Sequence, residues 1–173
     1  GDMDIYSWEI KGEQHFPVWS DHVLSLRGRA EVVNEYGHGE EMPISERLFA
    51  GGAGWSRGIR GFDYRDVGPK VVRILPDASE KYRPIGGRTL TIGSAEYVIP
   101  LVEKLKLVLF SDAGAVAEDA YDFGFGSMAV SAGVELRLDY RMFPIRFNYA
   151  WVIEKDDEHT DEHPWGFSVG SGF

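Results

Sequence analysis

Strict alternation of apolar and polar side chains recurs in seven separate segments, and this pattern constrains the fold more than any other feature of the chain. Every even-numbered residue from Val130 to Leu138 is apolar, whereas the odd-numbered residues between them are serine, glycine, glutamate and arginine. A β-strand sends two such sets to opposite faces, but a helix would mix them. We therefore predict strands at residues 5–18, 22–36, 88–100, 104–117, 127–142, 144–154 and 165–173.

The predicted strands leave two opposite architectures open. Most connections between them are short turns, which favours an antiparallel all-β fold. A soluble lipocalin-type barrel or sandwich would bury the apolar faces and expose the polar ones. A transmembrane β-barrel would instead turn its apolar faces to lipid and its polar faces to the lumen. The alternation itself does not distinguish the two.

Three further features favour the transmembrane β-barrel. The apolar faces carry almost no charge, while the polar faces carry charges of both signs, as a wide, wet lumen requires. Aromatic residues gather near strand ends, as they do where a barrel meets the membrane interface. The lumen charges are Arg27, Arg29, Glu31, Glu135, Arg137 and Arg146, and the aromatic belt is Trp19, Tyr36, Tyr140, Phe143, Trp151 and Trp165.

Composition excludes several classes of partner and site. The formal net charge of −10 leaves no basic surplus for the phosphates of a nucleic acid, so we expect no nucleic-acid partner. The chain has no cysteine and therefore neither disulfides nor thiolate metal ligands. We expect residues 1–3 to be a cloning remnant rather than the start of a signal peptide. The barrel segment is then predicted at residues 4–173.

Residues 37–87 interrupt the alternation. A connection of about fifty residues is uncommon in a compact domain and is usually functional or disordered. This one contains many glycines together with Phe49, Trp55, Phe62 and Tyr64. Such a composition predicts a packed, irregular loop.

The middle of this loop resembles a known motif. The stretch ERLFAGGAGWSRGIRGFDYRDVGPK, residues 46–70, is similar to the conserved loop of the BamA-type family of outer-membrane-protein assembly factors, which also includes TamA and the two-partner-secretion transporters. Residues 59–62 match the family's [V/I]RGF tetrapeptide. The glycine pair at 51 and 52 and the Gly-Pro-Lys at 68–70 match the flanks of the BamA branch.

Other segments resemble the same family in the expected order. IGGRTLTIGSAEYVIPL, residues 85–101, is similar to the strand after the loop, and it carries Glu96 at the family's acidic position. LVLFSDAGAVA, residues 107–117, is similar to the next strand, with Asp112 as its inward aspartate. The chain ends in FSVGSGF, like the family's C-terminal assembly signal, with Phe173 as the final aromatic residue.

This resemblance implies a fold and a site. The chain would be part of a sixteen-stranded barrel whose long loop folds back into the lumen. The family's loop arginine reaches carboxylates on the inner wall, which predicts that Arg60 bonds Asp112 and Glu96. Gly61 would permit the tight backbone turn, and Phe62 would lie beside the charged groups.

The resemblance also implies a function. Family members insert and fold other outer-membrane proteins in the bacterial outer membrane, without ATP or a cofactor, and a client strand pairs with an exposed barrel edge. The partners would be the lipid bilayer, client barrel proteins, and accessory proteins bound through upstream POTRA domains that this sequence lacks. One lip of the seam would be the last strand, with Phe167, Val169, Gly170 and Phe173.

The seven predicted strands are fewer than the sixteen that form the family's barrel. A barrel that narrow has room only for side chains. Either the chain closes alone and expels the long loop, or the open edges at 5–18 and 165–173 associate with a second copy, and we favour the second copy. The alternatives left open are a two-partner-type secretion pore and a barrel that anchors a passenger domain.

We expect no enzyme activity, cofactor or metal. His159, Asp161 and His163 lie in EKDDEHTDEHPW, which is typical of a solvated polar turn, and no helix brings the two histidines together. Glu135 and Arg137 are interpreted only as charges of the lumen wall.

Overall fold

Seven long strands form one antiparallel sheet, as the alternation predicts. The computed structural model describes residues 4–36, 42–53, 56–76, 80–140, 143–157 and 159–170, with the side chain of Tyr140 outside this description. Each observed strand begins within two residues of its predicted start; the last ends at Val169, and residues 171–173 lie outside the described part. The strands, in spatial order, are β1 (Asp4–Pro17), β2 (Val23–Tyr36), β6 (Thr89–Val102), β7 (Leu105–Ala117), β8 (Ala129–Tyr140), β9 (Phe143–Glu154) and β11 (Trp165–Val169).

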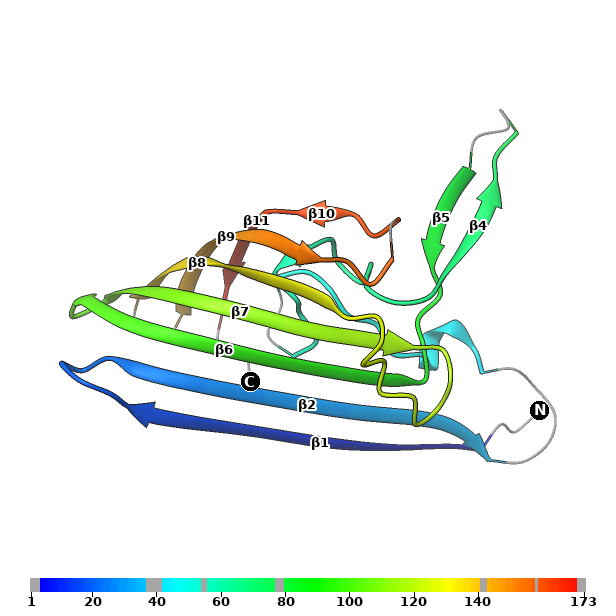
Figure 1. Cartoon of the computed structure of the whole chain (residues 1–173), viewed down its shortest axis with the longest axis horizontal. Helices are drawn as coiled ribbons and strands as arrows, with labels where there is room; N and C mark the ends of the chain where they lie inside the picture. Colours follow the sequence, from blue (N-terminus) through cyan, green and yellow to red (C-terminus); the bar gives the residue numbers. More distant parts are fainter. Residues whose placement is uncertain are drawn as a thin grey trace.

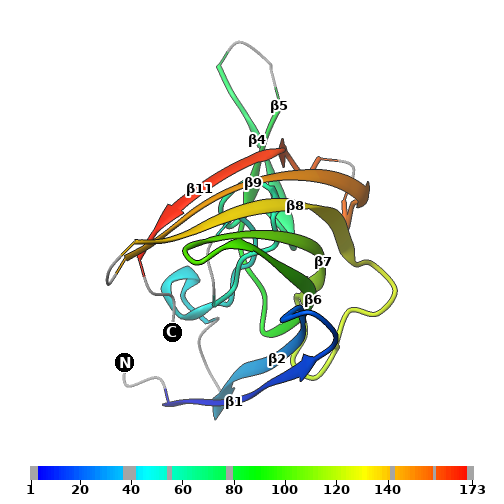
Figure 2. The same cartoon turned by 90° about the vertical axis from the view of Figure 1, so that its left-hand side faces the viewer.

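The sheet curls into an open arc. Strands β2 and β6 pair directly across the long insertion, from Val23 opposite Val98 to Val32 opposite Thr89. Strands β1 and β11 are the two ends of the strand order and do not pair with each other in the described part of the chain. Figure 2 shows the insertion on the concave side of this arc, except for a ribbon at residues 70–84 that projects beyond the sheet. Short turns therefore lie at one end of the strands and the long connections at the other (Figure 1).

The polar faces of the strands point inward. Leu136, Phe147 and Trp151 are 43%, 48% and 55% exposed on the convex side, whereas Glu96 and Asp112 are each 3% exposed on the concave side. A lipocalin-type protein would show the reverse arrangement. The inward charges and outward apolar side chains therefore confirm the membrane-type architecture.

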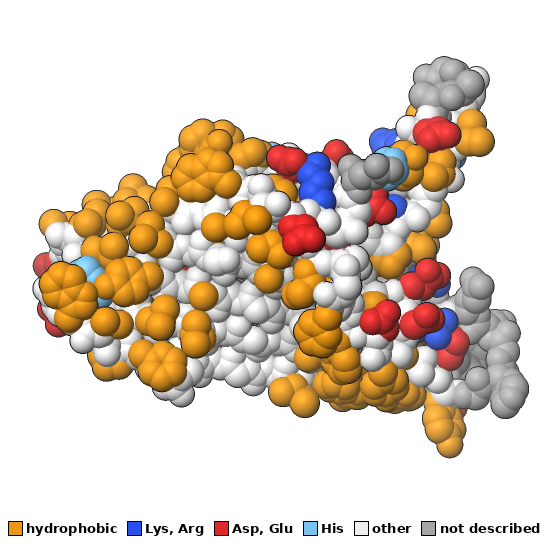
Figure 3. Space-filling model, in the orientation of Figure 1, with side chains coloured by type: hydrophobic (Ala, Val, Ile, Leu, Met, Phe, Trp, Pro, Cys, Tyr) orange, Lys and Arg blue, Asp and Glu red, His pale blue; other side chains and the backbone are white. Residues whose placement is uncertain are grey.

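Exposed aromatic residues flank this outer surface. Figure 3 shows hydrophobic side chains over much of the visible surface, with most of the visible charged groups toward the end that carries the long connections. The exposed members of the predicted belt are Trp19, Tyr36, Phe143, Trp151 and Trp165.

Among the described residues, no helix is both long and apolar enough to cross a membrane.

The insertion contains regular structure that the alternation did not predict. It holds a single 3-10 turn and a two-stranded ribbon that projects from the rest of the molecule (Figure 1). The prediction of a wholly irregular loop is therefore wrong for residues 70–84. The ribbon was missed because Val71 and Val72 are adjacent and break the two-residue period. These elements are η1 (Ile44–Glu46), β3 (Gly61–Phe62), β4 (Lys70–Ile74) and β5 (Glu80–Pro84), and β3 pairs with β10 (Glu162–His163).

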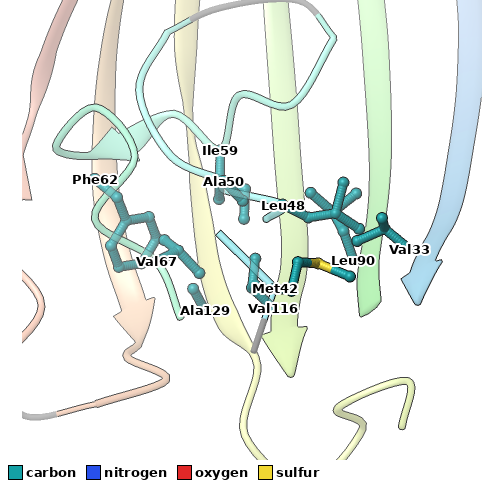
Figure 4. Packing of buried hydrophobic residues seen from close by; sticks show 10 residues of the cluster. All are labelled: Val33, Met42, Leu48, Ala50, Ile59, Phe62, Val67, Leu90, Val116 and Ala129. Atoms are coloured by element: carbon teal, nitrogen blue, oxygen red, sulfur yellow. The ribbon is translucent and has the colours of Figure 1, made fainter. Parts of the chain in front are cut away.

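A hydrophobic cluster holds the insertion against the wall. Ile59 and Phe62 are buried to 0% and 1% exposure and meet wall residues of β2, β6, β7 and β8 (Figure 4). Burying a side chain of this size stabilises by about 1.5–3 kcal/mol. The loop is therefore part of the packed structure and not a free strap. The cluster consists of Val33, Met42, Leu48, Ala50, Ile59, Phe62, Val67, Leu90, Val116 and Ala129.

Candidate functional site

Gly61 brings the backbone of the insertion against the inner wall. Its φ of +95° lies in the left-handed region that favours glycine. A Cβ atom at this position would lie 3.0 Å from Cβ of Ala150 and 3.3 Å from Cβ of Ser131. The hydroxyl of Ser131 donates to the carbonyl of Arg60 over 2.5 Å. The close approach fixes the backbone from which Arg60 extends.

Arg60 grips Asp112 of β7 with three donors. Its Nε donates to Oδ2 over 2.7 Å, its Nη2 to Oδ1 over 2.8 Å, and its backbone N–H to Oδ2 over 3.2 Å. Such a planar, two-pronged pair is the geometry in which arginine binds a carboxylate most strongly. Ser94 of β6 adds a hydrogen bond of 2.6 Å to Oδ1. Asp112 is therefore fully engaged by the loop and its neighbouring strand.

Two further carboxylates complete the surroundings of the guanidinium. Nη1 of Arg60 lies 3.0 Å from Oε1 of Glu96 and 3.1 Å from Oε2 of Glu135. Arg27 binds Glu96 over 2.6 Å, and Arg137 contacts both glutamates. Three arginines thus contact three carboxylates, and a fourth, the buried Arg146 of β9, interacts electrostatically with Glu96 and Glu135. Such pairing matters because an unpaired charge in such a buried place is strongly destabilising.

An aromatic ring closes the remaining side of Arg60. The guanidinium carbon lies 3.6 Å from the centroid of the Phe110 ring, a cation–π contact. Gly133, directly opposite Phe110 in the register, leaves the space that this ring occupies. Phe62 does not supply this contact; it packs in the hydrophobic cluster of Figure 4.

The structure therefore brings Arg60, Glu96 and Asp112 together and adds two residues that sequence reasoning did not place there, Glu135 and Phe110. Both lie on the inner face of neighbouring strands, and each is buried. The strand register could have located both residues near Arg60, because Phe110 pairs with Gly133, which is two residues from Glu135.

A second anchor, which we name the outer latch, consists of Lys70, Asp156 and Thr160. The side chain of Lys70 is 2% exposed, and its Nζ donates to Oγ1 of Thr160 and to the carbonyl of Asp66, each over 2.6 Å. Asp156 accepts from the N–H of Gly68 over 2.6 Å and from Thr160 over 2.9 Å. The latch ties the insertion to the connection between β9 and β11.

The prediction of a merely solvated turn at residues 155–164 is therefore wrong. Thr160 is 1% exposed, and β10 pairs with β3 through Glu162 opposite Phe62 and His163 opposite Gly61. The described residues contain no group of three or more His, Asp or Glu side chains placed to hold a metal ion. The polar composition of this connection reflects its contacts with the insertion.

Replacing Lys70 with methionine is expected to loosen the outer latch. The change leaves buried oxygen acceptors without their donor, which costs about 1–3 kcal/mol. Hydrogen exchange should become faster in residues 61–70 and 155–164 and stay unchanged in the rest of the wall. Lys104→Met, in an exposed short turn, is the matched control. Unaltered exchange in Lys70→Met would contradict the latch.

Asp66, whose backbone carbonyl accepts a hydrogen bond from Lys70 of the outer latch, predicts a pH dependence. Burial raises the pKa of the Asp66 carboxyl, although the N–H of Asp161 and the nearby Lys70 oppose this shift. Since the folded-state pKa lies above the unfolded value, the unfavourable contribution of Asp66 is fully present above the folded-state pKa, decreases as the pH falls below it, and is gone below the unfolded-state pKa. The stability difference between Asp66→Asn and the unaltered chain should therefore shrink on acidification. Thermal unfolding at several pH values measures it, and a constant difference would count against this assignment.

Among the described residues, the last strand, β11, pairs with another strand along one edge only. The N–H of Ala150 donates to the carbonyl of Pro164 over 2.8 Å, and the N–H of Gly170 donates to Pro144 over 3.1 Å. Even-numbered residues of this strand therefore bond to β9, and by alternation Phe167 and Val169 direct their backbone groups to the free edge.

Two glycines shape this edge. Gly170 follows the strand with a φ of +124°. Gly166 makes room for Asn148 and for Ala53 of the insertion, because a Cβ atom there would come within 2.8 Å of both. Phe173 lies outside the described residues.

Comparison with known proteins places this arrangement in a family. The model of the Omp85 superfamily domain matches residues 1–173. The fold is similar to the crystal structure of BamA from Haemophilus ducreyi lacking POTRA domains 1–3, with a TM-score of 0.79 and 24% sequence identity. The match covers 96% of this chain and 35% of that one, so the chain spans about a third of the length of the BamA structure. The chain therefore belongs to the Omp85 superfamily, and its curved sheet is a β-barrel segment of the bacterial outer membrane.

Proposed function

We propose that the chain takes part in inserting other β-barrel proteins into the outer membrane, with β11 as the strand on which a client strand pairs. The observation that carries this proposal is the free edge of β11, where the backbone groups of Phe167 and Val169 have no partner among the residues that the structure describes. An extended client strand gains main-chain hydrogen bonds when it adds to such an edge. The strand is also short, five residues, against twelve for its neighbour β9.

Arg60 with its partners Glu96, Asp112 and Glu135, which we call the Arg60 site, holds the insertion against the wall of the same sheet. Arg60 ties the insertion to β6, β7 and β8, and the outer latch ties the same insertion to the connection that leads into β11. Ala53 of the insertion also lies under Gly166 of β11. The insertion therefore contacts both the middle of the sheet and its last strand, and we infer that its position sets how far β11 can move.

Proline substitutions distinguish the role of the free edge of β11 from that of the edge paired with β9. Phe167→Pro removes an N–H that faces the free edge and leaves the ladder to β9 complete, whereas Ser168→Pro removes a donor of that ladder. In the full-length protein reconstituted in liposomes, Phe167→Pro should slow assembly of a client barrel while the protein's own melting temperature is retained. Ser168→Pro should lower that melting temperature. Normal client assembly by a stably folded Phe167→Pro protein would overturn the proposed role of the edge.

The edge of β1 also needs a partner. We propose that it pairs with a further strand, supplied by the same barrel or by a second copy, because its outward Ile10 and Phe16 belong to the same exposed apolar surface. A molar mass measured in detergent distinguishes the two sources. A dimer of the 173-residue chain supports the homodimer predicted from sequence, and a monomer contradicts it.

A further inference from the structure

We propose that the ribbon β4–β5 binds the phosphate-bearing headgroups of the lipid leaflet at the outer end of the barrel. This surface is distinct from the Arg60 site and from the edge of β11. In outer-membrane barrels the long connections face outward and the short turns face the periplasm. Figures 1 and 2 agree that the ribbon leaves the end with the long connections and extends past the convex side of the sheet. It therefore overhangs the side of the wall that faces lipid.

One face of the ribbon is basic. Arg73 lies directly opposite Lys81, and Arg83 lies opposite Val71 in the same antiparallel register. Side chains of one face alternate along each strand, so these three cations share a face. All three are exposed. The sequence thus concentrates positive charge on one projecting element of a chain whose formal net charge is −10.

These cations are not neutralised within the described part of the chain. No carboxylate there lies within salt-bridge distance of Arg73, Lys81 or Arg83. Like charges directly opposite each other on a ribbon repel and destabilise it. An anion bound between Arg73 and Lys81 would remove this repulsion. The charge pattern therefore calls for an external anion.

The opposite face identifies a lipid surface as the source of that anion. Val72 and Ile74 are 50% and 73% exposed on this face, and Tyr82 stacks on His159 with ring centroids 3.5 Å apart. The stack and the buried Lys70 hold the base of the ribbon to the barrel. Exposed Glu80 also lies on this face, opposite Ile74, and half-exposed Val71 lies on the basic face. An element that combines a cluster of cations with exposed apolar side chains suits the interface of an anionic membrane. A nucleic acid or an acidic protein would leave the exposed valine and isoleucine unexplained.

The absence of cysteine allows a local test of this proposal. Glu80→Cys in the 173-residue chain creates a single site for a nitroxide spin label on the ribbon. The labelled chain is placed in detergent micelles that contain either phosphatidylcholine or phosphatidylglycerol. We expect the label to become immobilised with phosphatidylglycerol only, and to be released by about 1 M NaCl, where the screening length is about 3 Å. The same concentration of inorganic phosphate should leave the spectrum unchanged.

Charge substitutions then identify the residues. Each basic side chain near an anionic membrane strengthens binding roughly fivefold, so Arg73→Gln, Lys81→Gln and Arg83→Gln together should weaken the response to phosphatidylglycerol about a hundredfold. The matching glutamate substitutions should abolish it. Lys104→Glu, at the opposite end of the strands, serves as the control and should behave like the unaltered chain. Equal label mobility in the two lipids, or a response that survives in both triple variants or in high salt, overturns the proposal.

Discussion

Replacing Arg60 with alanine is expected to destabilise the folded chain by about 3–5 kcal/mol, the cost of removing one partner from a buried ion pair. The change would leave the carboxylates of Asp112, Glu96 and Glu135 with two arginines where there are now three. The insertion would lose its ion pairs with the wall, and the three carboxylates, all on wall strands, would repel one another and destabilise the sheet around them. Unfolding in detergent measures the loss of stability, and protease cleavage within residues 56–70 reports the release of the insertion.

Two variants show whether charge or geometry matters at this position. Arg60→Lys keeps the positive charge but loses the planar fork that spans both oxygens of Asp112, so we expect it to recover less than half of the lost stability. Arg65→Ala removes an exposed arginine of the same insertion that stacks on Phe49. It should cost less than about 1 kcal/mol. Equal losses in Arg60→Ala and Arg65→Ala would contradict the special role of the buried site.

Substitution of Gly133 by valine is expected to have the second largest effect. A Cβ atom there would lie 2.2 Å from the carbonyl oxygen of Tyr149 and 2.6 Å from the ring of Phe110. The oxygen belongs to the backbone of the neighbouring strand and cannot move aside easily. Overpacking of this kind typically costs about 1–3 kcal/mol, and we expect the upper end because the Phe110 ring would also leave Arg60.

Gly93 provides the matched control for this substitution. It lies in the same sheet, and no atom comes within 4 Å of a Cβ atom built there. Gly93→Val should therefore leave the melting temperature in detergent nearly unchanged or raise it, since valine favours the strand conformation. A Gly133→Val protein that melts together with the Gly93→Val protein would show that Phe110 is not held as described.

The strands and their faces could be predicted from the sequence because both follow from a period of two. One residue that points inward, such as Glu96, determines which face of its whole strand points inward. A register error of one residue would have exposed every charge to lipid. The two-residue period alone does not show which face of the sheet contacts lipid. That orientation followed from the near absence of charge beside residues such as Leu136 and Phe147, which the structure leaves exposed on the convex face.

The surroundings of Arg60 could be predicted only in part. Asp112 and Glu96 were named through resemblance to a family motif, whereas Glu135 was interpreted as an ordinary wall charge. Its contact with Arg60 depends on how far β8 curves toward the insertion, and alternation carries no information on curvature. The same holds for Phe110, whose place above the guanidinium depends on the missing side chain of Gly133.

The structure of the long connections between strands is the part of the fold that the sequence predicts least well. The residues of the outer latch are Lys70, Asp156 and Thr160, and each is of a type that usually remains in water. The side chains of Lys70 and Thr160 are buried here, and Asp156 is half-buried, because two segments about ninety positions apart meet at the outer end of the barrel. Only tertiary structure reveals such a meeting.

A double-mutant cycle between Arg60 and Asp112 tests the central claim, that the insertion lies inside the curved wall and is held there by this pair. The free energies of unfolding in detergent are compared for Arg60→Ala, Asp112→Ala, the double variant and the unaltered chain. Groups in direct contact within a buried network show coupling energies of up to about 3 kcal/mol, and the distances of 2.7 and 2.8 Å predict a value above about 2 kcal/mol. Effects that add to within about 0.5 kcal/mol, as for independent sites, would contradict the account.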